Sequence, residues 1–304
     1  MDYIRGISFT GARRGKVSEA KESLELMKEK TGCNTVILVI GALQETAHSE
    51  KIDYKHSFMP KDEELKEIIQ YSQQIGLRVI LKPFLNCKDG TWRAYINFFD
   101  KDVVCEPKWC NWFQSYTDYQ MHYAKIANET SCEMLVIGCE MVMSERREME
   151  WRKLIEEIRT VYHGLITYNT DKYQEDNLTW WDALDVISSS GYYPIHDWDN
   201  QLDRIEAVVK KYNKPFFFGE AGCKSCTGAS KVPNDWTIQG DISHAEQEQY
   251  YRMMFDKCRD REFVHGFGFW DWHSKLYKEA DGLRDRGYAL YGKAACELIF
   301  QEWK

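Results

Sequence analysis

The chain has 304 residues, which is long enough for one large domain, and its formal net charge of −8 argues against nucleic-acid binding. No stretch approaches the roughly 18 apolar residues needed to span a membrane. With only 6 prolines and no linker-like tract, we expect residues 1–304 to form a single compact domain.

The cysteine pattern indicates free thiols. The ten cysteines are irregularly spaced, and several, such as Cys33, Cys139 and Cys258, fall in or beside apolar segments. The N-terminus, MDYIRGISF, lacks the basic and then apolar pattern of a secretory signal. We therefore predict a cytoplasmic protein. Cys223 and Cys226 have no second pair of ligands at metal-binding spacing, so no metal site is predicted.

Short apolar runs alternate with longer amphipathic segments from end to end. The longer segments, such as DEELKEIIQYSQQIG, carry apolar residues three and four positions apart, as amphipathic helices do. The runs that we predict as strands are residues 4–9, 35–40, 78–84, 134–140, 165–169, 186–192, 215–220 and 264–270.

Eight strands, each followed by a helical segment, are typical of the α/β class and of a single (β/α)8 TIM barrel. A doubly wound sheet is the alternative. That fold usually has a glycine-rich phosphate turn after its first strand, and the segment FTGARRGK does not match G-x-G-x-x-G. The barrel is therefore favoured.

Two glutamates end predicted strands. Glu140 follows MLVIGC at the fourth strand, and Glu220 ends KPFFFGE at the seventh. Chemistry in such barrels occurs at the carboxyl ends of the strands, where the fourth and seventh strands face each other. Retaining glycoside hydrolysis needs two carboxyl groups about 5–5.5 Å apart, one acting as general acid and one as nucleophile. We therefore predict Glu140 and Glu220 as catalytic residues, with no cofactor.

The remaining strand ends and the loop after the third strand are rich in amides, lysines and aromatic residues. Aromatic residues make up 14% of the chain, and indole rings pack well on the flat C–H faces of sugars. Lysine ammonium groups donate hydrogen bonds to hydroxyls. The candidate substrate-binding residues are Lys82, Asn86, Lys88, Trp92, Asn169, Tyr192, Trp270 and Trp272.

Six motifs resemble a known family: RGISF, LKPFLNCKDGTWRAYI, IGCEM, WWDALDVISSSGYYPI, FFFGEAGC and GFGFWDW. They cover nearly the whole chain and resemble clan A glycoside hydrolases, in particular glycoside hydrolase family 113, the bacterial β-mannanases. The resemblance implies Glu140 as acid/base and Glu220 as nucleophile. It also implies that Tyr192, or else Tyr193, hydrogen-bonds the nucleophile, and that Trp270 forms a floor for the sugar being cleaved.

The chain departs from the clan at one position. Most members carry Asn before the acid/base, where it meets the sugar 2-hydroxyl, and this chain carries Cys139. The residue that meets the 2-hydroxyl is therefore unassigned.

The resemblance implies a retaining enzyme that cleaves β-1,4-mannosidic linkages in mannan or manno-oligosaccharides. No nucleic acid, membrane or obligate protein partner is expected. The alternatives are the same chemistry on xylan or cellulose, and a carbohydrate-binding barrel that has lost catalysis. Retention of both carboxylates argues against the second alternative.

Overall fold

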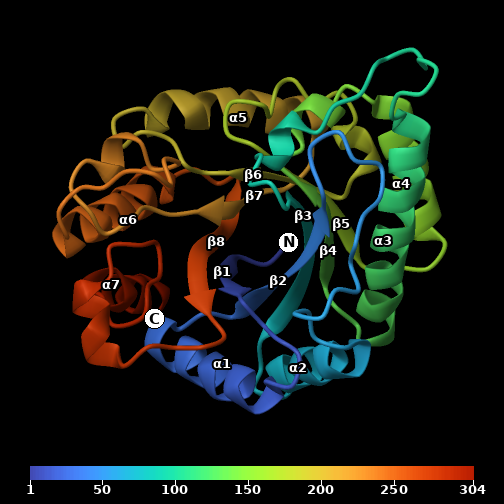
Figure 1. The fold of residues 1–304 in the computed structure, drawn as a ribbon. Helices are drawn as coiled ribbons and strands as arrows, with labels where there is room; N and C mark the ends of the chain where they lie inside the picture. Colours follow the sequence, from blue (N-terminus) through green and yellow to red (C-terminus); the bar gives the residue numbers. More distant parts are fainter.

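A computed structural model describes all 304 residues and confirms a closed barrel of eight parallel strands (Figure 1). Each strand pairs with the next in sequence, and β8 closes the barrel onto β1. The strands are β1 Ile4–Thr10, β2 Thr35–Gln44, β3 Arg78–Cys87, β4 Met134–Cys139, β5 Leu165–Thr170, β6 Val186–Ser190, β7 Phe216–Ala221 and β8 Val264–His273.

Helices form an outer ring around the barrel (Figure 1). They are α1 Val17–Thr31, α2 Asp62–Gln74, α3 Trp109–Glu129, α4 Glu148–Arg159, α5 Trp198–Tyr212, α6 His244–Cys258 and α7 Ala294–Trp303. None of them has the length and apolar character of a membrane-spanning segment.

The predicted alternation fails once, because only the 3-10 turn Trp181–Ala183 lies between β5 and β6. Two fully buried indoles, Trp180 and Trp181, occupy this part of the outer layer. Trp180 stacks on Trp151 of α4, with ring centroids 5.1 Å apart and planes 12° apart. Bulky side chains from the loop thus cover the sheet where a helix was expected.

Three strands run three or four residues further than their apolar runs predicted. β2 and β3 stay paired as far as Gln44 and Cys87, and β8 continues to His273. Polar and aromatic side chains continue these strands after the apolar run has ended. Asn86 therefore lies on a strand instead of in a loop, whereas Tyr192 lies just beyond the end of β6.

The barrel interior changes from apolar to polar along the strands. Successive side chains of a strand point to opposite faces, so every second residue faces inward. On β3, Ile80 belongs to the apolar interior and Lys82 follows it on the same face; on β6, Val186 is followed by Ser190. The buried interior cluster consists of Ile4, Ile37, Val39, Ile80, Met134, Val136, Val186 and Phe217. Buried polar groups therefore gather above this cluster, at the carboxyl-end mouth.

Candidate active site

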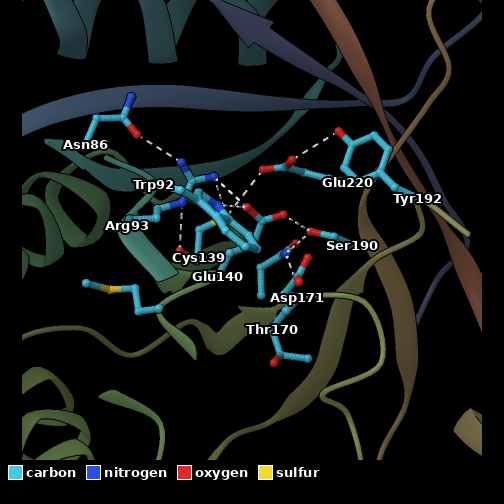
Figure 2. A network of polar contacts seen from close by, with 12 residues as sticks. Asn86, Trp92, Arg93, Cys139, Glu140, Thr170, Asp171, Ser190, Tyr192 and Glu220 are labelled. Atoms are coloured by element: carbon cyan, nitrogen blue, oxygen red, sulfur yellow. Dashed lines mark hydrogen bonds and ion pairs between the residues drawn. The ribbon is translucent and has the colours of Figure 1, made fainter. Parts of the chain in front are cut away.

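Glu140 directly follows β4 and has a left-handed backbone, with φ of 52°. Its backbone N–H donates to the carbonyl of Asn169 on β5 at 2.8 Å, which holds the turn against the neighbouring strand. A left-handed backbone is uncommon outside glycine and costs free energy, and such residues cluster at functional sites. The turn places the Glu140 side chain in the barrel mouth (Figure 2).

The carboxylate of Glu140 is buried and accepts three hydrogen bonds (Figure 2). Ser190 donates from Oγ to Oε1 at 2.6 Å. Arg93 donates from Nη2 to Oε2 at 2.9 Å, and Trp92 donates from Nε1 to the same oxygen at 3.3 Å. These donors come from β6 and from the loop after β3, so the carboxylate is fixed from two sides.

Glu220 lies on β7 with only 4% of its surface exposed. Lys82 donates to Oε1 at 2.6 Å, Tyr192 donates to Oε2 at 3.1 Å, and the Cys139 thiol donates to Oε1 at 3.3 Å. Burial alone would raise the pKa of Glu220, but the positive charges of Lys82 and Arg93 outweigh it and lower that pKa. Glu220 is therefore ionised at neutral pH.

Arg93 links the two carboxylates. Its guanidinium donates to Glu140, to the Cys139 carbonyl at 2.9 Å and to Asn86 Oδ1 at 2.9 Å. Cys139 in turn contacts Glu220 through its thiol. Figure 2 shows both carboxylates beside this guanidinium and facing the same space. An arginine held on three sides fixes the orientation of its carboxylate partner.

A second layer of polar contacts lies beneath the carboxylates. Asn169 donates from Nδ2 to Ser190 Oγ at 2.9 Å and accepts from Lys82 at 3.5 Å. Gly219 makes room for it, because a Cβ at that position would lie 2.0 Å from Asn169 Oδ1. Asn169 thus supports the partners of both glutamates.

Trp270 and Trp272 have different environments. Trp270 is partly exposed and packs on the apolar interior cluster, so it forms part of the floor of the mouth. The prediction for Trp272 is wrong: it is fully buried and donates from Nε1 to Ser23 of α1 at 2.9 Å. The β1–β8 pairing shifts register in this region, which resets the alternation and turns Trp272 toward the helices.

Two lysines predicted to bind sugar have other partners. Lys82 is fully buried beneath Glu220 as its ion-pair partner. Lys88 directly follows β3, is exposed and pairs with the exposed Glu45. Its side chain contacts Glu45 instead of either catalytic candidate, and a contact between Lys88 and the sugar stays a prediction.

Of the two tyrosine candidates, Tyr192 contacts Glu220, while the Tyr193 hydroxyl donates to the buried Glu175.

Three residues of the site were not predicted from the sequence: Arg93, Ser190 and Asp171. The alternation of inward-facing residues along β6 could have predicted Ser190. Asp171 follows β5 and is buried; burial and the nearby charge of Glu140 raise its pKa to about 7.

The structure contains no group of three or more His, Cys, Asp or Glu side chains placed to hold a metal ion. Cys223 and Cys226 are buried free thiols.

Comparison with known proteins gives a consistent result. The model of the family described as Glycoside Hydrolase Family 113 matches residues 8–293. No curated protein matches the sequence. A solved structure described as a complex of a GH113 β-1,4-mannanase is 55% identical, has a TM-score of 0.98 and covers 100% of this chain and 99% of that one. The β-mannanase AaManA from Alicyclobacillus acidocaldarius, in complex with ManMIm, is 36% identical, has a TM-score of 0.95 and covers 100% and 97%.

More distant structures share the fold. The β-glucuronidase of Ruminococcus gnavus is 16% identical, with a TM-score of 0.69 over 100% of this chain and 50% of that one.

Proposed function

This chain belongs to glycoside hydrolase family 113, and we propose that it is a retaining β-1,4-mannanase with Glu220 as nucleophile and Glu140 as acid/base. One observation carries the assignment of roles. Both buried carboxylates contact a cation, Arg93 at Glu140 and Lys82 at Glu220, and the combined charges of Lys82 and Arg93 lower the pKa of Glu220. A carboxylate that is held ionised suits the nucleophile, which must attack without first losing a proton.

In the first step Glu220 attacks the anomeric carbon of the mannosyl unit, and the carboxyl group of Glu140 donates its proton to the departing glycosidic oxygen. The electron pair of the broken C–O bond leaves with that oxygen. Tyr192 and Lys82 hold Glu220 in place and stabilise its charge before attack. A covalent mannosyl–enzyme ester results.

In the second step Glu140, now a carboxylate, accepts a proton from water, which attacks the same carbon from the opposite face. Glu220 leaves as a carboxylate, and the product keeps the β configuration. Ser190 and Arg93 hold Glu140 through both steps, so one side chain serves as acid and then as base.

The substrate assignment follows from the family and from the aromatic surfaces of the mouth. Trp92 is 39% exposed and donates a hydrogen bond to Glu140. The ring of Tyr95 packs edge-on against the ring of Trp92, with centroids 5.9 Å apart. Trp270 supplies the floor. Exposed rings around two carboxylates suit an uncharged sugar chain.

Reducing-sugar release from mannan, xylan and carboxymethylcellulose, measured side by side, tests the substrate. We expect mannan to be cleaved fastest, and the substrate assignment is wrong if mannan is the poorest of the three. Following the anomeric protons by NMR during early hydrolysis tests the stereochemistry: β product must form first and then mutarotate.

A further inference from the structure

The backbone at Glu140 is held by two consecutive hydrogen bonds to β5. The first is the bond from the Glu140 N–H to the Asn169 carbonyl at 2.8 Å. In the second, the N–H of the next residue, Met141, donates to the hydroxyl of Tyr168 at 2.9 Å. Met141 and Tyr168 are both buried, and a buried N–H that loses its partner is costly. The left-handed backbone of Glu140 persists only where its surroundings hold it, so the Tyr168 hydroxyl is one of two anchors of this turn.

The Tyr168 hydroxyl is itself held by a buried acid. It donates to Oε1 of Glu145 at 2.8 Å, and the hydroxyl of Thr170 donates to the same oxygen at 2.8 Å. Because the hydroxyl proton of Tyr168 points to Glu145, a lone pair of the hydroxyl oxygen is left to accept from Met141. The groups form a chain of hydrogen bonds in which each bond polarises the next. That chain runs from Glu145 to the peptide that follows the proposed acid/base.

The ring of Tyr168 has a place prepared for it on the outside of the barrel wall. A Cβ at Gly138, on β4, would lie 2.7 Å from the Tyr168 ring, so glycine leaves room for the ring. The ring packs edge-on against Trp151 and Trp180, with centroids 5.1 Å away in both cases. Trp180 also donates from Nε1 to the backbone carbonyl of Glu145 at 3.0 Å. The ring and the acceptor of its hydroxyl are thus both fixed by tight packing.

We propose that Tyr168 and Glu145 are positioning residues for the acid/base, which hold the Glu140 turn from behind the barrel wall through the backbone N–H of Met141. The proposal rests on the proposed function, because Glu140 needs a fixed position only if it transfers protons. Side chains on the outer face of a strand point away from the mouth, so the Tyr168 hydroxyl acts on the reaction through Glu140 and not through the sugar. Glu220, on β7, keeps its own donors.

Tyr168→Phe tests the hydroxyl and keeps the ring. Met141 loses its acceptor, so Glu140 is no longer held in line with the glycosidic oxygen. Mannohexaose has a leaving group that needs a proton, and kcat/KM on it should fall by about 10- to 100-fold. An aryl mannoside with a good leaving group needs no proton from Glu140, and kcat/KM on it should fall by less than about threefold. The ratio of the two losses is the measurement.

Tyr162→Phe is the matched control. Tyr162 is buried, follows α4 and donates from its hydroxyl to the Cys132 carbonyl at 2.8 Å. Cys132 precedes β4, so this hydrogen bond lies at the amino end of the strand, away from Glu140. Each variant removes one buried hydroxyl that contacts the backbone, so the two Tm values should fall alike. Only Tyr168→Phe should distinguish the two leaving groups.

Changes at Glu145 test whether this residue acts through Tyr168. Glu145→Leu removes the acceptor and should show the same dependence on the leaving group. Glu145→Gln still accepts from Tyr168 and Thr170 and should stay within about twofold of wild type. The double variant Tyr168→Phe/Glu145→Leu should lose little more than the larger of the two single losses, because both changes break one chain. Fully additive losses would overturn the chain.

The kinetics of Tyr168→Phe can also overturn the positioning role directly. Equal losses on both substrates would contradict it, and so would unchanged kcat/KM on both. The same leaving-group dependence in Tyr162→Phe would show that any lost buried hydroxyl has this effect, which would overturn the proposal as well. Failure of the proposed function looks different, because wild type would then leave mannohexaose uncut.

Discussion

Lys82 and Glu220 form an ion pair inside the barrel, with 2.6 Å between Nζ and Oε1, and both side chains are almost fully buried. Burial would lower the pKa of Lys82, yet the adjacent negative charge raises it. The pKa of Glu220 is lowered in return. Each charge is retained because the other is present, so the lysine acts on the proposed nucleophile and not on the sugar.

Removing this lysine should shift the pH dependence of catalysis. In Lys82→Met the positive charge that keeps Glu220 ionised is lost, so the pKa of Glu220 rises. The nucleophile must be ionised to attack, and the acid limb of kcat/KM should therefore move to higher pH. The free energy of unfolding at pH 7 should fall by about 3–5 kcal/mol, because a buried carboxylate loses its partner.

The matched control for that variant is Lys88→Met, since Lys88 directly follows β3, the strand that carries Lys82, and pairs with the exposed Glu45. Its acid limb and its stability should stay at wild-type values. Lys82→Arg keeps the charge and should hold the acid limb near its original position. An unshifted limb in Lys82→Met, with the protein still folded, would contradict the ion-pair assignment.

Azide should distinguish the roles of the two glutamates. Glu220→Ala should lose about 10⁴-fold or more in kcat, and azide should restore turnover by attacking from the vacated side, which gives an α-mannosyl azide. Glu140→Ala should still form the covalent intermediate from an activated aryl mannoside, and azide should then give the β product. NMR of the azide products reads the outcome, and reversed configurations would exchange the two assignments.

Much of the fold was predictable because one pattern repeats. Apolar runs whose starts lie 21 to 56 residues apart predicted eight strands, and the closed barrel confirms them. Strand order then placed Glu140 and Glu220 in one mouth. The missing helix between β5 and β6 was not predictable, because Trp180 and Trp181 fill its place through tertiary packing that no local period encodes.

Within the site, residues on strands were easier to predict than residues in loops. Lys82 and Asn169 follow the inward alternation, and both lie at the carboxylates. Trp272 fails because an irregularity in β8 resets the alternation. Arg93 was missed because it belongs to a short 3-10 turn, where neither spacing nor composition tells which way a side chain points.

Replacing Arg93 should harm the acid step more than binding. In Arg93→Lys the contacts to Asn86 and to the Cys139 carbonyl cannot both be kept, so Glu140 loses its fixed orientation. We expect kcat on mannan to fall by about 10²-fold or more. Hydrolysis of an aryl mannoside with a good leaving group, which needs no acid, should fall much less. The ratio of the two losses is the measurement, and equal losses would contradict a positioning role.

Asn86→Ala is a milder test of the same positioning role of Arg93. It removes one of the three contacts of Arg93 and leaves the guanidinium in place. A smaller loss of about tenfold, with the same dependence on the leaving group, is expected from the loss of one charge-assisted hydrogen bond.

Glu145 should make the stability of the protein fall as pH rises. Burial raises its pKa to about 8, although Tyr168 and Thr170 each donate a hydrogen bond to it at 2.8 Å. In the unfolded chain the group titrates near its ordinary value of about 4.3. The folded state therefore holds a proton that the unfolded state has lost, and stability decreases between about pH 4 and pH 8.

The variant Glu145→Gln tests this, because glutamine accepts the same two hydrogen bonds without titrating. Urea unfolding at pH 5 and pH 9 should show a decrease smaller by about 3–5 kcal/mol in Glu145→Gln than in wild type. Glu156→Gln, an exposed change on the nearby helix α4, should keep the wild-type decrease, and identical slopes in all three proteins would rule Glu145 out as the source.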